Sequence, residues 1–238
     1  MKAPATLTTA LTATTAAACA ALALTAPAAS AATTTVRQET ATGAPYSGNW
    51  QVSTVGTLDF AITFLGIRVT GTCDGANLKG TVQSTGPGAL TAASIGACRT
   101  SNGFSSPATD LDLSTVPDKS GAVTYAPVAG GRDGVLTING ALRFKIEGEF
   151  LGSVRTCWYK FRTGTTDGLA FDVYNRDNPN RPLPNDDAQG KSSNITLVRD
   201  TGSDLLCPSN GTGSGAAIAR GESTPGSGVF DRKLYLTS

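Results

Sequence analysis

The chain has 238 residues, 28 of them glycine, and no histidine, which excludes histidine-dependent catalytic triads, histidine-ligated metals and a histidine pH switch. Residues 1–31 carry a single charge, Lys2, and the rest of the chain has 18 basic and 18 acidic residues. That net charge of zero argues against nucleic acid or an anionic membrane as the main partner.

The first 31 residues have the composition of a signal peptide. Lys2 supplies the positive charge at the N-terminus, and an Ala- and Leu-rich segment follows from Ala10 to Leu24. Ala29-Ser30-Ala31 then fits the small-x-small cleavage rule. The apolar segment is too short for a retained transmembrane helix. Cys19 could be lipidated instead, but the three residues directly before it are alanines, and a lipidation signal normally has a leucine there. We therefore expect a secreted, extracellular protein with a signal peptide over 1–31, a flexible lead-in over 32–48 and one domain over 49–238.

Beyond the leader, apolar and polar residues alternate with the period of a β-strand, and no window keeps helical spacing without a Gly or Pro. This pattern predicts an all-β antiparallel β-sandwich, or a flattened barrel, of roughly ten strands. Two stretches are expected to be irregular: a long polar loop, Asn175–Lys191, and a mobile Gly/Ser turn, Ser209–Gly215. The predicted strands cover 58–64, 67–73, 78–82, 111–113, 134–150, 157–161, 169–173, 195–197 and 229–236. The segment 134–150 is either one long strand or a strand pair broken near Asn139-Gly140, a dipeptide that is typical of hairpins.

The domain retains four cysteines: Cys73, Cys98, Cys157 and Cys207. An even number in an exported chain predicts disulfides, for which three connectivities exist. The sequential pairing closes the shortest loops and is preferred. A metal site is disfavoured because no two cysteines have C-x-x-C spacing and no histidine could complete a ligand set.

The spacing around these cysteines resembles that of small secreted proteins of actinobacteria, an uncharacterised group. The matching elements are Cys73-x-x-x-x-Leu78-x-Gly80-x-Val82, Ile95-x-x-Cys98, Cys157-x-Tyr159, the late Cys207 and a strand ending near Leu236. The resemblance spans most of residues 55–238. It implies a disulfide-linked β-sandwich with an extracellular home, and it assigns no catalytic residue.

Glu147 and Glu149 are the candidate catalytic pair. They lie two positions apart in a predicted strand, so both carboxylates would leave one face about 7 Å apart at Cα. Glycosidases place two carboxylates about 5 Å or more apart around the bond that they cleave. However, Arg143 and Lys145 share this face and offer simple charge pairing. The pattern therefore favours a solvated strand face over catalysis.

The Asn175–Lys191 loop is rich in oxygen-bearing side chains, among them Asp177, Asp186 and Asp187. Calcium takes such ligands, but the D-x-[DN]-x-[DN]-G spacing is absent and basic residues of the loop compete for the same carboxylates. A polar loop is favoured over a calcium site. The three aspartates stay as binding candidates.

Trp158 is the aromatic candidate for ligand contact. Because neighbours in a strand point to opposite faces, Cys157 and Tyr159 share one face and Trp158 occupies the other. We expect Tyr159 to pack near a buried disulfide and Trp158 to face outward, where it could contact sugar. Core packing of Trp158 is nevertheless favoured over ligand contact.

The sequence contains many predicted strands and no set of residues typical of a catalytic site. This favours a secreted, non-catalytic protein with a binding or surface-structural role. Its partner would be an extracellular glycan or protein, and not nucleic acid or, after leader removal, a membrane. We expect no cofactor and no metal. The alternative is a carboxylate-dependent extracellular polysaccharide hydrolase that uses Glu147 and Glu149, but the missing histidine leans against an enzyme.

Overall fold

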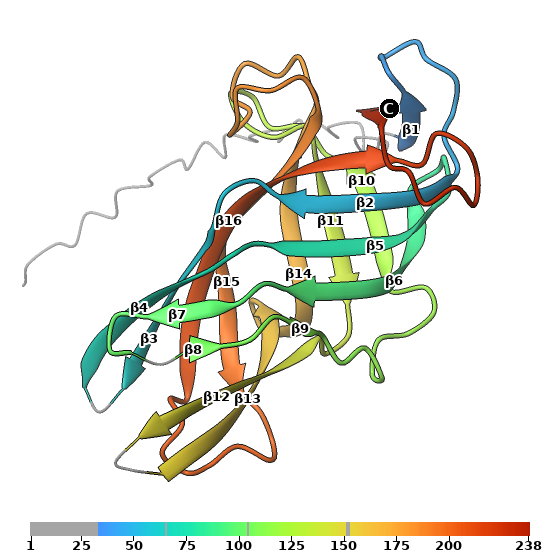
Figure 1. Cartoon of the computed structure of the whole chain (residues 1–238). Coiled ribbons are helices and arrows are strands. Elements are labelled where there is room, and N and C mark those ends of the chain that lie inside the picture. Colours follow the sequence, from blue (N-terminus) through green and yellow to red (C-terminus); the bar gives the residue numbers. More distant parts are fainter. Residues whose placement is uncertain (1–32, 65, 104, 151–152) are drawn as a thin grey trace, which may run out of the picture. The chain divides into compact units, whose positions relative to one another are not determined.

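The computed structural model describes residues 33–64, 66–103, 105–150 and 153–238. These residues form strands joined by turns and loops, and every pairing between named strands is antiparallel (Figure 1). The described part of the chain contains no helix that could span a bilayer. The strands are β1 (Thr35–Gln38), β2 (Gly48–Thr54), β3 (Leu58–Phe64), β4 (Ile67–Cys73), β5 (Ala76–Val82), β6 (Pro87–Ile95), β7 (Cys98–Thr100), β8 (Ser105–Ser106), β9 (Thr109–Asp110), β10 (Gly121–Tyr125), β11 (Gly134–Asn139), β12 (Arg143–Phe150), β13 (Ser153–Thr163), β14 (Thr166–Tyr174), β15 (Ala188–Arg199), β16 (Asn210–Gly221) and β17 (Arg232–Thr237).

Eight of these strands hydrogen-bond in a closed circuit, in the order β16, β2, β5, β6, β10, β11, β14, β15 and back to β16. Their inward side chains, among them Trp50 and Ile138, form most of the main apolar core, to which Leu142 is added from the segment between β11 and β12. Trp50 faces Gly80 across the β2–β5 pair, and a Cβ at Gly80 would lie 2.5 Å from the indole ring. Glycine is therefore required there, because any larger residue would displace the ring.

The longest strands of the circuit, β15 and β16, continue beyond it and carry two wings (Figure 1). The β3 wing consists of β3, β4 and β7 and pairs with the first half of β16. The β12 wing consists of β12 and β13 and pairs with the second half of β15, after a register shift between Ser193 and Ile195. Phe60 of the first wing packs against Phe144 and Tyr159 of the second. The fold thus combines a flattened barrel with a two-layered sandwich, as the alternating pattern predicts.

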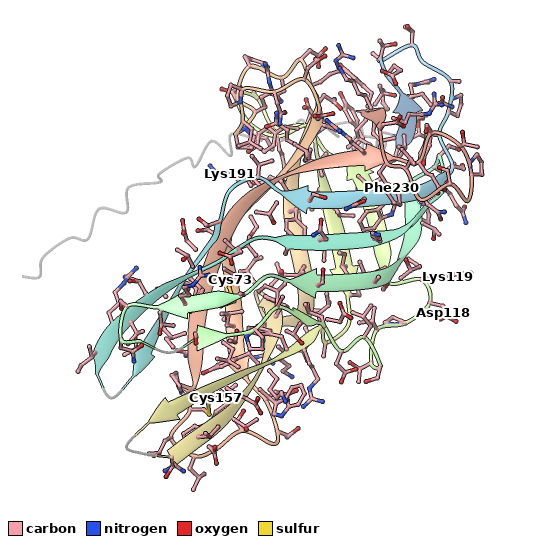
Figure 2. The ribbon with its side chains drawn as sticks, viewed as in Figure 1. Cys73, Asp118, Lys119, Cys157, Lys191 and Phe230 are labelled. Carbon is pink, nitrogen blue, oxygen red and sulfur yellow. A yellow bond between two sulfur atoms is a disulfide. The ribbon has the colours of Figure 1, made fainter. Side chains whose placement is uncertain are left out.

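Both predicted disulfides are present, with the sequential pairing. Cys73–Cys98 joins β4 to β7 within the β3 wing, and Cys157–Cys207 joins β13 to the β15–β16 loop (Figure 2). Since such bonds persist in oxidising surroundings, they indicate an oxidising compartment. The predicted signal peptide and Cys19 lie outside the described residues.

The Gly/Ser stretch expected to be a mobile turn, Ser209–Gly215, instead begins strand β16. Its glycines let side chains of the β3 wing approach closely, since a Cβ at Gly215 would lie 2.4 Å from Leu58 and one at Gly211 would lie 2.5 Å from Ile62. The composition that suggested a turn is therefore a requirement of cross-strand packing.

The expected lead-in, 32–48, is also part of the fold. It contains β1, which pairs with the C-terminal strand β17 and buries Val36. Tyr46 follows in the same stretch and is buried, and its hydroxyl accepts a hydrogen bond from the N–H of Glu222. These contacts are long-range, which is why local composition did not reveal them.

Two strand predictions need correction. Asn139-Gly140 does mark a break, but it is not a hairpin, because β11 pairs with β10 and β14 whereas β12 pairs with β13. The chain passes there from the circuit to the β12 wing. Leu111 and Leu113 follow the short strand β9 and pack against the core without forming a strand of their own.

Candidate binding site

The candidate catalytic carboxylates lie on the β12 wing. Glu147 is exposed, its carboxylate lies 3.1 Å from the ammonium of Lys145, and it accepts a 3.4 Å hydrogen bond from the Thr156 hydroxyl. Glu149 pairs with Val154 in the strand register, and its side chain lies outside the described part. The described carboxylate of the pair thus makes the charge pairing expected of a solvated strand face.

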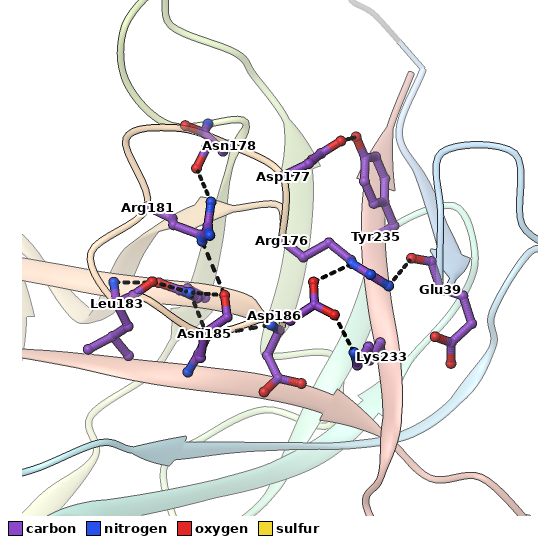
Figure 3. Close-up of polar contacts among 12 residues, drawn as sticks. Glu39, Arg176, Asp177, Asn178, Arg181, Leu183, Asn185, Asp186, Lys233 and Tyr235 are labelled. Carbon is purple, nitrogen blue, oxygen red and sulfur yellow. Dashed lines mark hydrogen bonds and ion pairs between the residues drawn. The ribbon is translucent and has the colours of Figure 1, made fainter.

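The predicted loop 175–191 ends at Asp187, because β15 begins at Ala188, and the aspartates of this 175–187 loop are held by side chains around them (Figure 3). Asp177 accepts a hydrogen bond from the Tyr235 hydroxyl. Asp186 bridges Arg176 and Lys233, and these cations, Lys233 first, hold the pKa of its carboxyl below the usual range.

Asp187 is buried and receives two parallel hydrogen bonds, of 2.9 and 2.8 Å, from the guanidinium of Arg220. Buried Gln189 then binds the backbone of the same loop, through the N–H and carbonyl oxygen of Leu183. No group of three or more potential metal-ligating side chains is found in the described residues. The loop carboxylates therefore order the loop and give it its fixed shape.

Trp158 is half-buried on the outer side of β13. The guanidinium of Arg143 lies 4.9 Å from the centre of its ring, and Gly202 packs against the ring edge. Tyr159, by contrast, is 2% exposed and lies beside the Cys157–Cys207 disulfide, as strand alternation predicts. Trp158 therefore does not present a bare ring to a sugar.

The residues singled out from sequence do not converge. The 175–187 loop lies at the end of the circuit near β1 and β17, whereas β12 and β13 form the opposite end of the molecule (Figure 1). Of the described residues, neither Glu147 nor Trp158 is part of the lining of the four hollows found in the described part, and the loop contributes Asn175 to one of them. The candidate residues therefore do not form a shared site in the described part of the chain.

An apolar hollow lies between the two wings, and sequence reasoning missed it. Its volume is about 100 Å³, and its lining includes side chains from both wings and from β15 and β16. One polar side chain in the lining is unusual: Ser192 of β15 is 4% exposed, and its hydroxyl has no hydrogen-bond partner among the described residues. A buried hydroxyl without a partner costs free energy, so it marks a position where a ligand can add a bond.

A second hollow of about 60 Å³ adjoins the first. Four side chains line both hollows, namely Phe60, Ile62, Ile146 and Tyr159. Its lining includes half-buried Arg155 and exposed Leu206, so this hollow lies next to the surface. We call the two hollows together the apolar tract.

Each disulfide lines one hollow, Cys73–Cys98 the inner one and Cys157–Cys207 the outer one. Burial raises the pKa of the Tyr159 hydroxyl to about 12, so this group is neutral and donates a hydrogen bond to the carbonyl oxygen of Pro208. Walls fixed by covalent links make the apolar tract a preformed cavity, and the phenol of Tyr159 adds no charge to it.

A polar groove of about 600 Å³ lies on the outer face of the β3 wing. Threonine and serine hydroxyls line it together with Asp59, Arg68 and Arg99, and Arg99 is paired with Asp74. Phe60 is the one aromatic residue among its described lining residues. The groove therefore offers hydroxyl contacts and no row of aromatic rings on which sugars could stack.

No protein-family model, curated protein or solved structure matches the chain. The function must therefore be argued from the site.

Proposed function

We propose that the protein is exported and binds a small, mainly apolar molecule in the apolar tract, without catalysis. The observation that carries this proposal is the unpartnered hydroxyl of Ser192 inside a hollow that is otherwise almost wholly apolar. A few polar groups in an apolar cavity are typical of small-molecule sites, where they fix the orientation of the ligand. The two disulfides and the resemblance to small exported actinobacterial proteins support an extracellular location.

The alternative, a carboxylate-dependent polysaccharide hydrolase, has weaker support. Its described carboxylate, Glu147, is exposed and paired with Lys145 on a strand face that lines neither hollow. A glycan ligand in the polar groove has hydroxyl partners but only Phe60 for stacking. The apolar tract is therefore the better supported site.

The proposal is tested by titrating the purified, oxidised protein with 1-octanol and recording backbone amide NMR spectra. We expect saturable shifts confined to residues that line the apolar tract. The chain length is chosen because a cavity of about 150 Å³ accommodates benzene, a molecule with six carbons. Shifts that do not saturate, or that lie mainly elsewhere, would overturn the proposal.

A cavity-filling variant makes the test specific. Gly190 lines the inner hollow, and a Cβ there would meet only the Cβ of Phe171, at 3.9 Å. Gly190→Val should therefore fold and abolish octanol binding. Lys191→Gln is the matched control, since its side chain is on the exposed outer face of the same strand (Figure 2) and should leave binding unchanged.

A further inference from the structure

The apolar tract ends at an arginine on the apolar face of its wing. In β13, Arg155 has the same parity as Cys157 and Tyr159, and these two residues line the tract. Strand alternation therefore directs the Arg155 side chain to the inner side of the wing, where an apolar residue is expected. Gly148 is its partner across the β12–β13 pair, so no cross-strand side chain competes for the space.

The charge of Arg155 is unbalanced. No acidic side chain of the described residues pairs with it, and its Nε atom is buried without a hydrogen-bond partner. The guanidinium cannot lose its proton in a protein, so burial cannot relieve the charge by neutralisation. The buried Nε donor is costly while it has no partner, and an anionic partner would satisfy this donor and balance the charge.

Other arginines of the wings differ in this respect. Arg143 pairs with Asp200 and Asp112, and Arg162 pairs with Asp167. Arg68 is without an ion-pair partner in the described part, but it is exposed on the outer groove, where water solvates it. Arg155 alone among these combines an unpaired charge with a place in the lining of the apolar tract.

We propose that the apolar tract binds an amphiphile whose alkyl chain lies among Phe60, Ile62, Ile146 and Tyr159 and whose carboxylate pairs with Arg155. This inference rests on the proposed function and adds the ligand class. A guanidinium matches a carboxylate with two parallel hydrogen bonds, so the head group would be fixed at the surface end. The combined size of the hollows suits a chain of about six to eight carbons, judged against a cavity that accommodates benzene.

The test compares sodium octanoate with 1-octanol at neutral pH by isothermal titration calorimetry and NMR, using the purified, oxidised protein. We expect octanoate to bind about tenfold or more tightly than octanol, the size of effect for a charge-assisted hydrogen bond. Arg155→Gln should remove this preference and leave octanol affinity unchanged, and Arg155→Lys should retain part of it. Arg68→Gln is the control and should leave both affinities as they are.

The outcomes separate the two proposals. Saturable octanol binding without a preference for octanoate would overturn the carboxylate assignment and leave the apolar site standing. Equal losses of both ligands in Arg155→Gln, with an unchanged NMR fold signature, would also overturn it, because they would make Arg155 part of the wall and not the anion partner. No binding of either ligand would overturn the proposed function itself.

Discussion

Two buried serines of this protein should respond in opposite ways to the same substitution. The hydroxyl of Ser192 has no partner among the described residues, whereas Ser120, which is 0% exposed, accepts a 3.0 Å hydrogen bond from the N–H of Leu90. An unsatisfied buried polar group costs about 1–3 kcal/mol. Ser192→Ala removes such a group and nearly keeps the shape of the cavity. Ser120→Ala creates one, by leaving the Leu90 N–H unpaired.

We therefore expect Ser192→Ala to raise the free energy of unfolding by about 1 kcal/mol, the lower end of that range, because lost packing contacts of the oxygen offset part of the gain. Ser120→Ala should lower it by about 1–3 kcal/mol. For a protein of this size, 1 kcal/mol corresponds to a Tm change of about 2–4 °C, which thermal unfolding followed by circular dichroism resolves. A Tm that falls in Ser192→Ala as it does in Ser120→Ala would refute the reasoning, because it would show that the Ser192 hydroxyl makes a stabilising bond.

Three more predictions follow from the fold. Gly80→Ala should lower the free energy of unfolding by at least about 2 kcal/mol, because the added Cβ overlaps the neighbouring indole. Gly190→Ala has open space around the added Cβ and should be neutral or slightly stabilising. Urea titrations measure both effects, and equal effects would contradict the packing argument. Replacing the Cys157–Cys207 pair by alanines should cost about 4 kcal/mol from loop entropy, since 50 residues separate the cysteines, and a loss below 1 kcal/mol would count against it. The N–H groups of Gly228 and Gly226 hold the pKa of the Glu222 carboxyl below 4.5. The stabilisation by this carboxylate should therefore be complete above pH 4.5 and should be lost as the pH falls through the lower pKa of the folded state. A Tm–pH profile that is unchanged in Glu222→Gln would argue against this.

Sequence reasoning predicts much of the fold because alternation is local. The strand with Phe60 and Ile62, the opposite facing of Trp158 and Tyr159 and both disulfides all follow from spacing along the chain. The number of strands does not, since short elements such as β8 and β9 depend on pairing partners and not on their own residues.

The apolar tract could not be predicted for a related reason. Its lining comes from strands that are far apart in the sequence. A hollow forms where the side chains of such strands leave space between them, and local patterns do not reveal this. The sequence around Ser192 does not show that its side chain is buried, because the position of β15 in the sheet decides this. Arg155 carried a local signal that could have been used: a basic residue with the same parity as Cys157 and Tyr159 in an amphipathic strand.

The pairing of the first strand with the last sets the order in which this chain can fold. β1 pairs with β17, and β2 pairs with β5 on one side and with β16 on the other, so each of the two earliest strands lacks a partner until the last part of the chain is available. A chain that emerges with its N-terminus first, from a ribosome or from a translocation pore, therefore cannot close the circuit while it is still being threaded. Long-range pairing of this kind slows folding. The circuit can therefore close only after β15 and β16, near the end of the chain, are available.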